Sequence, residues 1–197
     1  MTKLGVVMDP IGSINVKKDS TLAMLVEAQA RGWSIYYMEQ GELFLRDGTA
    51  YAQTRQLKVS FDADSWFEMG KAEILPLAEL DTILMRKDPP FDTEYIYATY
   101  ILEQAEAAGT LVVNRCQSLR DANEKMYTAW FPQCTPPTLV TRKESQIRDF
   151  LAEHNDIILK PLWGMGGAMI FRLRQHDPNI GVAIETLTEY GSRFAMA

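Results

Sequence analysis

The sequence predicts an α/β protein whose first part is built on a parallel sheet. Apolar runs of strand length alternate with helix-length patterns along the 197 residues. The opening shows this order most clearly, with an apolar run at 4–8, a helical pattern over 21–31 and a second apolar run at 34–38. Two neighbouring strands that are joined through a helix pair in parallel, so this opening predicts a strand–helix–strand unit.

The first helix and the segment after the second strand carry local signals. Asp19 or Ser20 can cap the helix through a side-chain oxygen, and Gly32 stands where a positive φ commonly ends a helix. An Asp-Gly pair at 47–48 separates two strand-like runs within 43–59. This pattern predicts a hairpin inserted beside the parallel sheet.

The remaining elements follow from apolar periodicity and from Gly and Pro stops. In the first part we expect a strand at 82–85, a helix over 93–108 and a strand at 111–113. A domain boundary is expected near 118–123, which divides the chain into 1–122 and 123–197. The second part is expected to hold helices at 123–131, 143–154 and 180–190, and strands at 138–140, 157–159, 169–173 and 193–197.

Composition and charge exclude several classes of protein. Hydrophobic content of 47% and charged content of 23% are ordinary for a globular protein. A net charge of −6 and a pI near 5.0 argue against a nucleic-acid surface. Neither a membrane span nor a signal peptide is apparent. Two cysteines and two histidines predict a reduced, cytoplasmic protein without a zinc site.

A glycine-rich loop follows the apolar run at 157–159. Lys160 comes first, and glycines stand at 164, 166 and 167. Glycines expose backbone N–H groups that can wrap a phosphate, and a lysine adds a point charge. However, the loop is not a P-loop, and Met169 stands where the dinucleotide fingerprint needs its third glycine. From the residues alone, a nucleotide site and a purely steric turn both stay open.

Four motifs, in this order, resemble the bacterial glutathione synthetase family. They are Val7-Met8-Asp9-Pro10-Ile11, the run Arg86-Lys87-Asp88-Pro89-Pro90-Phe91-Asp92, Ser118-Leu119-Arg120-Asp121, and Lys160-Pro161-Leu162 with Gly164-Met165-Gly166-Gly167. The resemblance covers residues 1–197, and the run at 86–92 is its most specific part.

The resemblance implies an ATP-grasp ligase that joins γ-glutamylcysteine to glycine and splits ATP to ADP and phosphate. Phosphorylation of the peptide carboxylate gives an acyl phosphate, which the glycine amine attacks. The implied fold is a Rossmann-like N-terminal, pre-ATP-grasp domain that binds the peptide substrate, followed by the first α+β half of an ATP-grasp domain. For intact enzymes of the family a homotetramer is implied, with no nucleic-acid or membrane partner.

The resemblance also implies site residues. For ATP they are Lys125, Lys160, Gly164, Met165, Gly166 and Gly167, and for the peptide substrate they are Arg86, Asp9, Ser13, Asn15 and Lys18. Ordinary alternatives remain. Lys125 on an expected helix can be a solvated surface lysine, and Arg86 can form an ion pair with Asp88 or Glu94. No catalytic or metal-binding residue is assigned within the chain, and ligands for Mg²⁺ are expected downstream of Ala197.

Three departures from the family pattern stand out. Trp163 replaces the usual aspartate before the glycines, and Arg115-Cys116 replaces a more typical Lys-Pro. The family continues past Ala197, so we expect the chain to be incomplete for catalysis and its last strand to expose an unpaired edge. Two alternatives are a fragment that only binds γ-glutamylcysteine or glutathione, and another ATP-grasp ligase such as one that adds glutamate to ribosomal protein tails. The run at 86–92 argues against the latter.

Overall fold

The computed structural model describes residues 1–163 and 166–197. The chain divides into two compact units, Met1–Asp121 and Ala122–Ala197, and each is described by itself. Among the described residues, no helix has the length and apolar character needed to cross a membrane.

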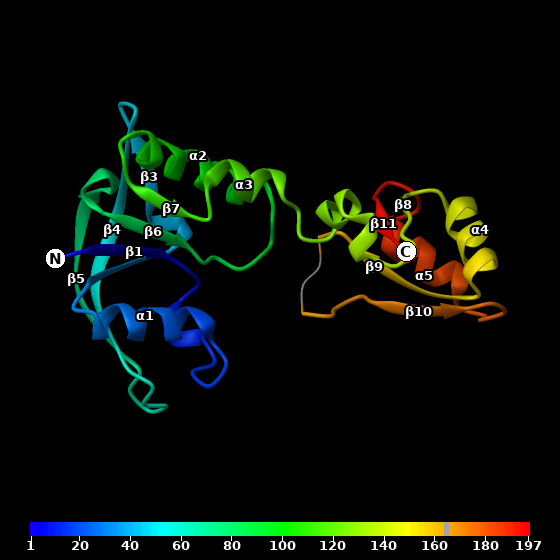
Figure 1. The fold of residues 1–197 in the computed structure, drawn as a ribbon, viewed down its shortest axis with the longest axis horizontal. Helices are drawn as coiled ribbons and strands as arrows, with labels where there is room; N and C mark the ends of the chain where they lie inside the picture. The colour runs from blue at the N-terminus through cyan, green and yellow to red at the C-terminus, as the bar shows by residue number, and fades with distance from the viewer. Residues whose placement is uncertain (164–165) are drawn as a thin grey trace. The chain divides into compact units, whose positions relative to one another are not determined.

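The first unit has a parallel sheet at its centre, as predicted. Its parallel strands are β1 (Lys3–Val7), β2 (Ser34–Met38), β6 (Thr82–Met85) and β7 (Leu111–Val113), in the order β2-β1-β6-β7. Helix α1 (Ser20–Ala30) packs on one face and α2 (Thr93–Ala107) on the other (Figure 1). Adjacent residues of β1 therefore enter different cores, with Val6 beside α1 and Val7 beside α2.

Helices α1 and α2 each begin at an aspartate cap. Asp19 Oδ1 accepts a hydrogen bond from the Leu22 N–H at 2.7 Å, and Asp92 Oδ1 accepts one from Tyr95 at 2.9 Å. After α1 the chain turns at Gly32, which has φ of 77°. Short 3₁₀ turns, η1 (Ile11–Ser13), η2 (Gln40–Glu42) and η3 (Leu77–Glu79), join the larger elements.

A group of antiparallel strands extends this sheet. The predicted hairpin is β3 (Leu43–Arg46) with β4 (Thr49–Val59), turning at Asp47 and Gly48, both of which have positive φ. Strand β5 (Phe67–Pro76) pairs with β4 and was not predicted. Most of β5 is exposed on both faces, so its sequence lacks the apolar alternation that marks a half-buried strand.

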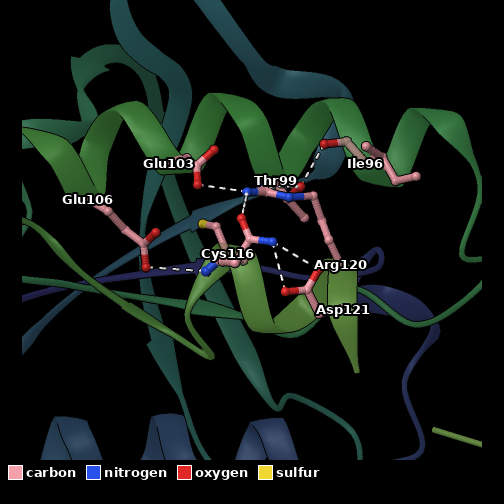
Figure 2. A network of polar contacts seen from close by, with 8 residues as sticks. Ile96, Thr99, Glu103, Glu106, Cys116, Arg120 and Asp121 are labelled. Atoms are coloured by element: carbon pink, nitrogen blue, oxygen red, sulfur yellow. Dashed lines mark hydrogen bonds and ion pairs between the residues drawn. The ribbon is translucent and has the colours of Figure 1, made fainter. Parts of the chain in front are cut away.

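Helix α3 (Cys116–Asp121) occupies the segment where the sequence suggested only a boundary. Arg120 attaches α3 to α2, donating to Thr99 Oγ1 at 3.0 Å and to Glu103 Oε1 at 2.7 Å. Its guanidinium also lies 4.6 Å from the centre of the Tyr100 ring. Figure 2 shows the Arg120 side chain beside Thr99 and Glu103, and the buried Cys116 lying close by.

In its described residues, the second unit has a four-stranded antiparallel sheet and two α-helices. Its strands are β8 (Val140–Thr141), β9 (Asp156–Pro161), β10 (Phe171–Arg174) and β11 (Ala195–Met196), in the order β10-β9-β11-β8. Helices α4 (Glu144–His154) and α5 (Ile180–Thr188) bury Ile147, Leu151 and Ile184 against this sheet.

Two expectations for the second unit are wrong. The expected helix at 123–131 is a turn followed by the 3₁₀ segments η4 (Met126–Trp130) and η5 (Pro132–Cys134). The Asn123 side chain accepts hydrogen bonds from the backbone N–H groups of Lys125 and Met126 at the start of the turn. Pro132, which has no backbone N–H to donate, stands at the start of η5 and prevents a longer helix from continuing through the segment. Strand β11 does not expose an unpaired edge, because it lies between β9 and β8.

Candidate functional site

A pocket in the first unit opens where β1 and β6 end. Its volume is about 560 Å³. Because β1 and β6 are adjacent and parallel, the loops that follow them meet at one edge of the sheet. The N-terminus of α1 reaches the same edge. The lining residues come from these three places: Met8, Asp9, Pro10, Ser13, Ile14, Asn15, Lys18, Asp19, Ser20, Thr21, Arg86, Asp88 and Pro89.

Arg86 is held against the start of α1. Its Nε donates to Thr21 Oγ1 at 3.0 Å and its Nη2 donates to Ser20 Oγ at 3.1 Å. Within the described part of the chain, the ion pair with Asp88 or Glu94 that offered the ordinary alternative does not form. Since a guanidinium has five N–H donors, further donors remain for a planar anion such as a carboxylate.

Asp9 ties the two loops of the pocket together. One of its oxygens lies 2.9 Å from Lys87 Nζ, and the other accepts the Asp88 N–H at 2.9 Å. Both contacts cross from the end of β1 to the residues that follow Arg86. Asp9 therefore positions the loop that carries Arg86, in addition to lining the pocket.

The other three predicted substrate residues lie on the loop between β1 and α1. Ser13 Oγ donates to the Pro10 carbonyl at 2.7 Å, and Asn15 Oδ1 accepts the Lys17 N–H at 3.1 Å. Lys18 is exposed. The structure thus brings all five predicted residues to one pocket, while their role in binding stays a prediction.

The pocket carries charges of both signs. Arg86 and Lys18 supply positive charge, and Asp9, Asp19 and Asp88 supply negative charge. An anion alone would meet repulsion from the carboxylates, whereas a small molecule with both carboxylate and ammonium groups can pair with each set. The chemistry therefore favours an amino-acid-like or peptide ligand.

The second unit places Lys160 on β9. Ile157 and Leu159 on this strand are buried in the core, whereas Ile158 is 44% exposed and Lys160 is half-buried. Lys160 lines a hollow of about 490 Å³ together with Ile158, Thr138, Met196, Ala197 and other residues of this unit. An ammonium group beside apolar side chains suits a flat ligand with an anionic end.

The glycine loop follows this strand. Gly166 and Gly167 have φ of 66° and 78° and are exposed, so their backbone adopts the conformation that glycine tolerates best. Gly164 and Met165, also predicted to contact ATP, lie outside the described residues. The Trp163 ring, 44% exposed, lies 5.4 Å from the Arg193 guanidinium carbon. The indole at this departure from the family pattern therefore contacts a cation of its own unit.

Lys125 lies in the turn before η4 and is not a helical, solvated lysine. Its side chain is only 16% exposed and forms an ion pair with Glu124. It is not among the residues that line the hollow beside Lys160. Lys125 is therefore a partly buried lysine, and it does not line the hollow that Lys160 lines.

Sequence reasoning missed the residues that hold Arg86. The sequence marks Ser20 and Thr21 only as the start of a helix. It marks Lys87, which contacts Asp9, only as part of a motif. The pairing of β1 with β6 brings these groups together, and the order of elements along the chain did not specify that pairing. The sequence held one signal of these contacts, which is that a predicted helix N-terminus follows the first predicted strand.

Two family models match this chain. Residues 2–120 match the prokaryotic glutathione synthetase N-terminal domain, and residues 124–197 match the prokaryotic glutathione synthetase ATP-grasp domain. The chain belongs to the prokaryotic glutathione synthetase family. The resemblance and the α/β fold class inferred from the sequence are thereby confirmed.

Curated relatives agree with this membership. The glutathione synthetase of Yersinia pestis is 65% identical over all 197 residues, and that of Escherichia coli strain K12 is 62% identical over the same length. In both comparisons the chain spans 62% of the relative's length.

Solved structures share the fold at low sequence identity. D-cycloserine synthetase DcsG matches 98% of this chain and 58% of its own, with a TM-score of 0.63 and 15% identity. D-alanyl-alanine synthetase A from Vibrio cholerae matches 99% of this chain and 59% of its own, with a TM-score of 0.56 and 10% identity. At these identities the likeness concerns the fold alone.

Proposed function

We propose that this chain belongs to an ATP-dependent ligase that joins γ-glutamylcysteine and glycine to form glutathione, and that its first unit binds γ-glutamylcysteine. The observation that carries the proposal is the pocket where β1 and β6 end, which gathers Arg86, Lys18 and Asp9. γ-Glutamylcysteine is a zwitterion with two carboxylates and one ammonium group. Arg86 pairs with a carboxylate, and the aspartates of the pocket balance the ammonium group.

For ATP, the proposal assigns the second unit. Lys160 and the backbone N–H groups of the exposed residues Gly166 and Gly167 have the donor chemistry that phosphates need. Lys125, Gly164 and Met165 complete the proposed set. When bound, ATP supplies the phosphoryl group that activates the peptide carboxylate. The task of these residues is to position the phosphates and to balance their charge.

A resident metal site does not appear among the described residues. No group of three or more His, Cys, Asp or Glu side chains there is placed to hold a metal ion. We therefore assign no step in this chain to Mg²⁺, although the family implies its use. A homotetramer and a cytoplasmic location belong to the same proposal.

A titration of the 197-residue chain with γ-glutamylcysteine tests the substrate assignment. Isothermal titration calorimetry should show saturable binding, and a glutamate-rich peptide that resembles the tail of a ribosomal protein should bind more weakly. A preference for that peptide would favour the other type of ATP-grasp ligase and contradict the proposal.

Phosphate release distinguishes ligation from binding alone. The chain is incubated with Mg-ATP, γ-glutamylcysteine and glycine, and Lys160→Ala is prepared identically to reveal contaminating ATPase. Turnover that is lost in Lys160→Ala would show ligation by the chain itself. Binding of γ-glutamylcysteine without such turnover favours the second candidate, in which the chain only binds the peptide.

A further inference from the structure

The loop between β1 and α1 carries three of the five residues proposed to bind γ-glutamylcysteine. These are Ser13, Asn15 and Lys18, and all three are exposed. Surface loops are mobile unless their backbone is anchored to the fold, so such side chains keep their places only if the loop is fixed at both ends. The Asp19 cap of α1 fixes the later end. The earlier end is fixed at Ile11.

Ile11 is held on three sides. Its side chain is 1% exposed and lies in the core on the α1 side of the sheet. Its backbone N–H donates to the Tyr37 hydroxyl at 3.3 Å, and its carbonyl accepts a hydrogen bond from Trp66 Nε1 at 2.9 Å. Tyr37 lies on β2, and Trp66 stands directly before β5. Elements distant in the sequence therefore fix both polar groups of one loop peptide.

The Tyr37 hydroxyl is free to accept from Ile11 because its own proton is directed elsewhere. It donates to Glu39 Oε1 at 2.6 Å. A hydroxyl has one donor and two acceptor positions, so both contacts can form together. Burial, together with the Glu39 carboxylate, raises the pKa of Tyr37, so the hydroxyl keeps its proton.

The hairpin of β4 and β5 places Trp66. It runs past α1 to its turn (Figure 1), and the Gln29 side chain on α1 holds the end of β4 by two hydrogen bonds of 2.9 Å to Val59. Across the turn, the Ser60 N–H donates to the Trp66 carbonyl at 2.9 Å. The Phe67 ring meets the indole edge to face, with centroids 5.5 Å apart. The backbone and the ring of Trp66 are thus both fixed, which gives the indole N–H a defined direction.

We propose that Trp66 is a positioning residue of the substrate pocket, which acts by holding the Ile11 carbonyl and so fixing the loop that carries Ser13, Asn15 and Lys18. Trp66 does not appear among the described residues that line the pocket, so its effect passes through the loop. This inference rests on the proposed function, because it concerns the pocket assigned there to γ-glutamylcysteine.

Calorimetric titration of Trp66→Phe with γ-glutamylcysteine tests the positioning role. The variant keeps an aromatic ring but loses the indole N–H. Its Kd should rise roughly three- to tenfold, the change expected for one neutral hydrogen bond. Tyr37→Phe, which removes the partner on the other side of Ile11, should raise the Kd in the same direction.

The matched control is Trp33→Phe. Trp33 is also a partly buried tryptophan of the first unit, but it follows the other end of α1 from the pocket. Its Kd should equal that of the original chain. Equal rises in Trp33→Phe and Trp66→Phe would indicate a general loosening of the unit and overturn the positioning role.

The indole signal of Trp66 gives a readout that a merely structural residue would not change. In ¹H–¹⁵N NMR spectra of the original chain, this signal is assigned through its own backbone. It should shift as γ-glutamylcysteine is added, with the calorimetric Kd, because a ligand on the loop alters the contact at the Ile11 carbonyl. The Trp33 signal should stay in place.

The outcomes separate this inference from the proposed function. If the original chain binds γ-glutamylcysteine but Trp66→Phe has the same Kd, or the Trp66 signal does not respond, the positioning role is wrong and the proposed function stands. If the original chain does not bind γ-glutamylcysteine, the proposed function is contradicted, and the positioning role with it.

Discussion

At the residue scale, Asp9 has a positioning role that its place in the sequence did not reveal. Its two oxygens hold Lys87 Nζ and the Asp88 N–H. In Asp9→Ala these groups lose their partner, and the loop carrying Arg86 gains freedom. We expect the Kd for γ-glutamylcysteine to rise about tenfold, as a lost charge-assisted contact would give. Calorimetry measures this change, and an unaltered Kd together with an unaltered fold would remove Asp9 from the site.

The buried Cys116 thiol predicts how the stability of the fold depends on pH. Burial and the nearby Glu106 carboxylate raise the pKa of its thiol from 9.0 to about 12. Between these values the unfolded chain releases a proton that the folded chain keeps, so the free energy of unfolding falls as pH rises. At pH 10, the Cys116 thiol has lowered the free energy of unfolding by about 1 kcal/mol.

Urea unfolding at pH 8 and pH 10 measures that loss. The chain with Cys116→Ala should lose less stability between the two pH values than the original chain, whatever its stability at pH 8. An equal loss in both chains would show that Cys116 has an ordinary pKa in the folded state.

At the element scale, the attachment of α3 to α2 depends on Arg120. Its side chain is 11% exposed and bridges Thr99 and Glu103. In Arg120→Ala, hydrogen exchange at backbone amides of 116–121 should become faster by roughly tenfold, as expected when a partly buried charged hydrogen bond is lost. Arg31→Ala, which removes an exposed pair on α1, should leave these amides unchanged. Equal rates in the Arg120 variant would show that the other contacts of α3, such as the hydrogen bond from the Cys116 N–H to Glu106, hold it without Arg120.

The elements also show which parts of the fold could be predicted from the sequence. Buried apolar strands such as β1 and β2, and the helices α1 and α2, were predicted because their signals are local. Strand β5 was missed because nearly all of it is exposed. The helix expected at 123–131 is replaced by short 3₁₀ segments, since Pro132 cannot donate a backbone hydrogen bond. The site residues were found through the resemblance, whereas the Ser20 and Thr21 contacts with Arg86 depend on strand pairing that no local pattern encodes.

At the scale of the whole molecule, two units with separate cores carry two different kinds of donor. The first unit presents a mixed-charge pocket where β1 and β6 end, and the second presents Lys160 and positive-φ glycines. The chain spans 62% of the length of the relatives in its family. The proposed function therefore depends most on whether the first unit binds its proposed substrate through the pocket.

Calorimetric titration of Arg86→Ala with γ-glutamylcysteine tests that claim most directly. Loss of a charge-assisted hydrogen bond should raise the Kd by roughly 10- to 100-fold. The matched control is Arg46→Ala, which removes an arginine of the same unit whose side chain is 77% exposed on β3. We expect weak binding in Arg86→Ala and unchanged binding in Arg46→Ala. Equal affinity in both variants and the original chain would contradict the proposed function.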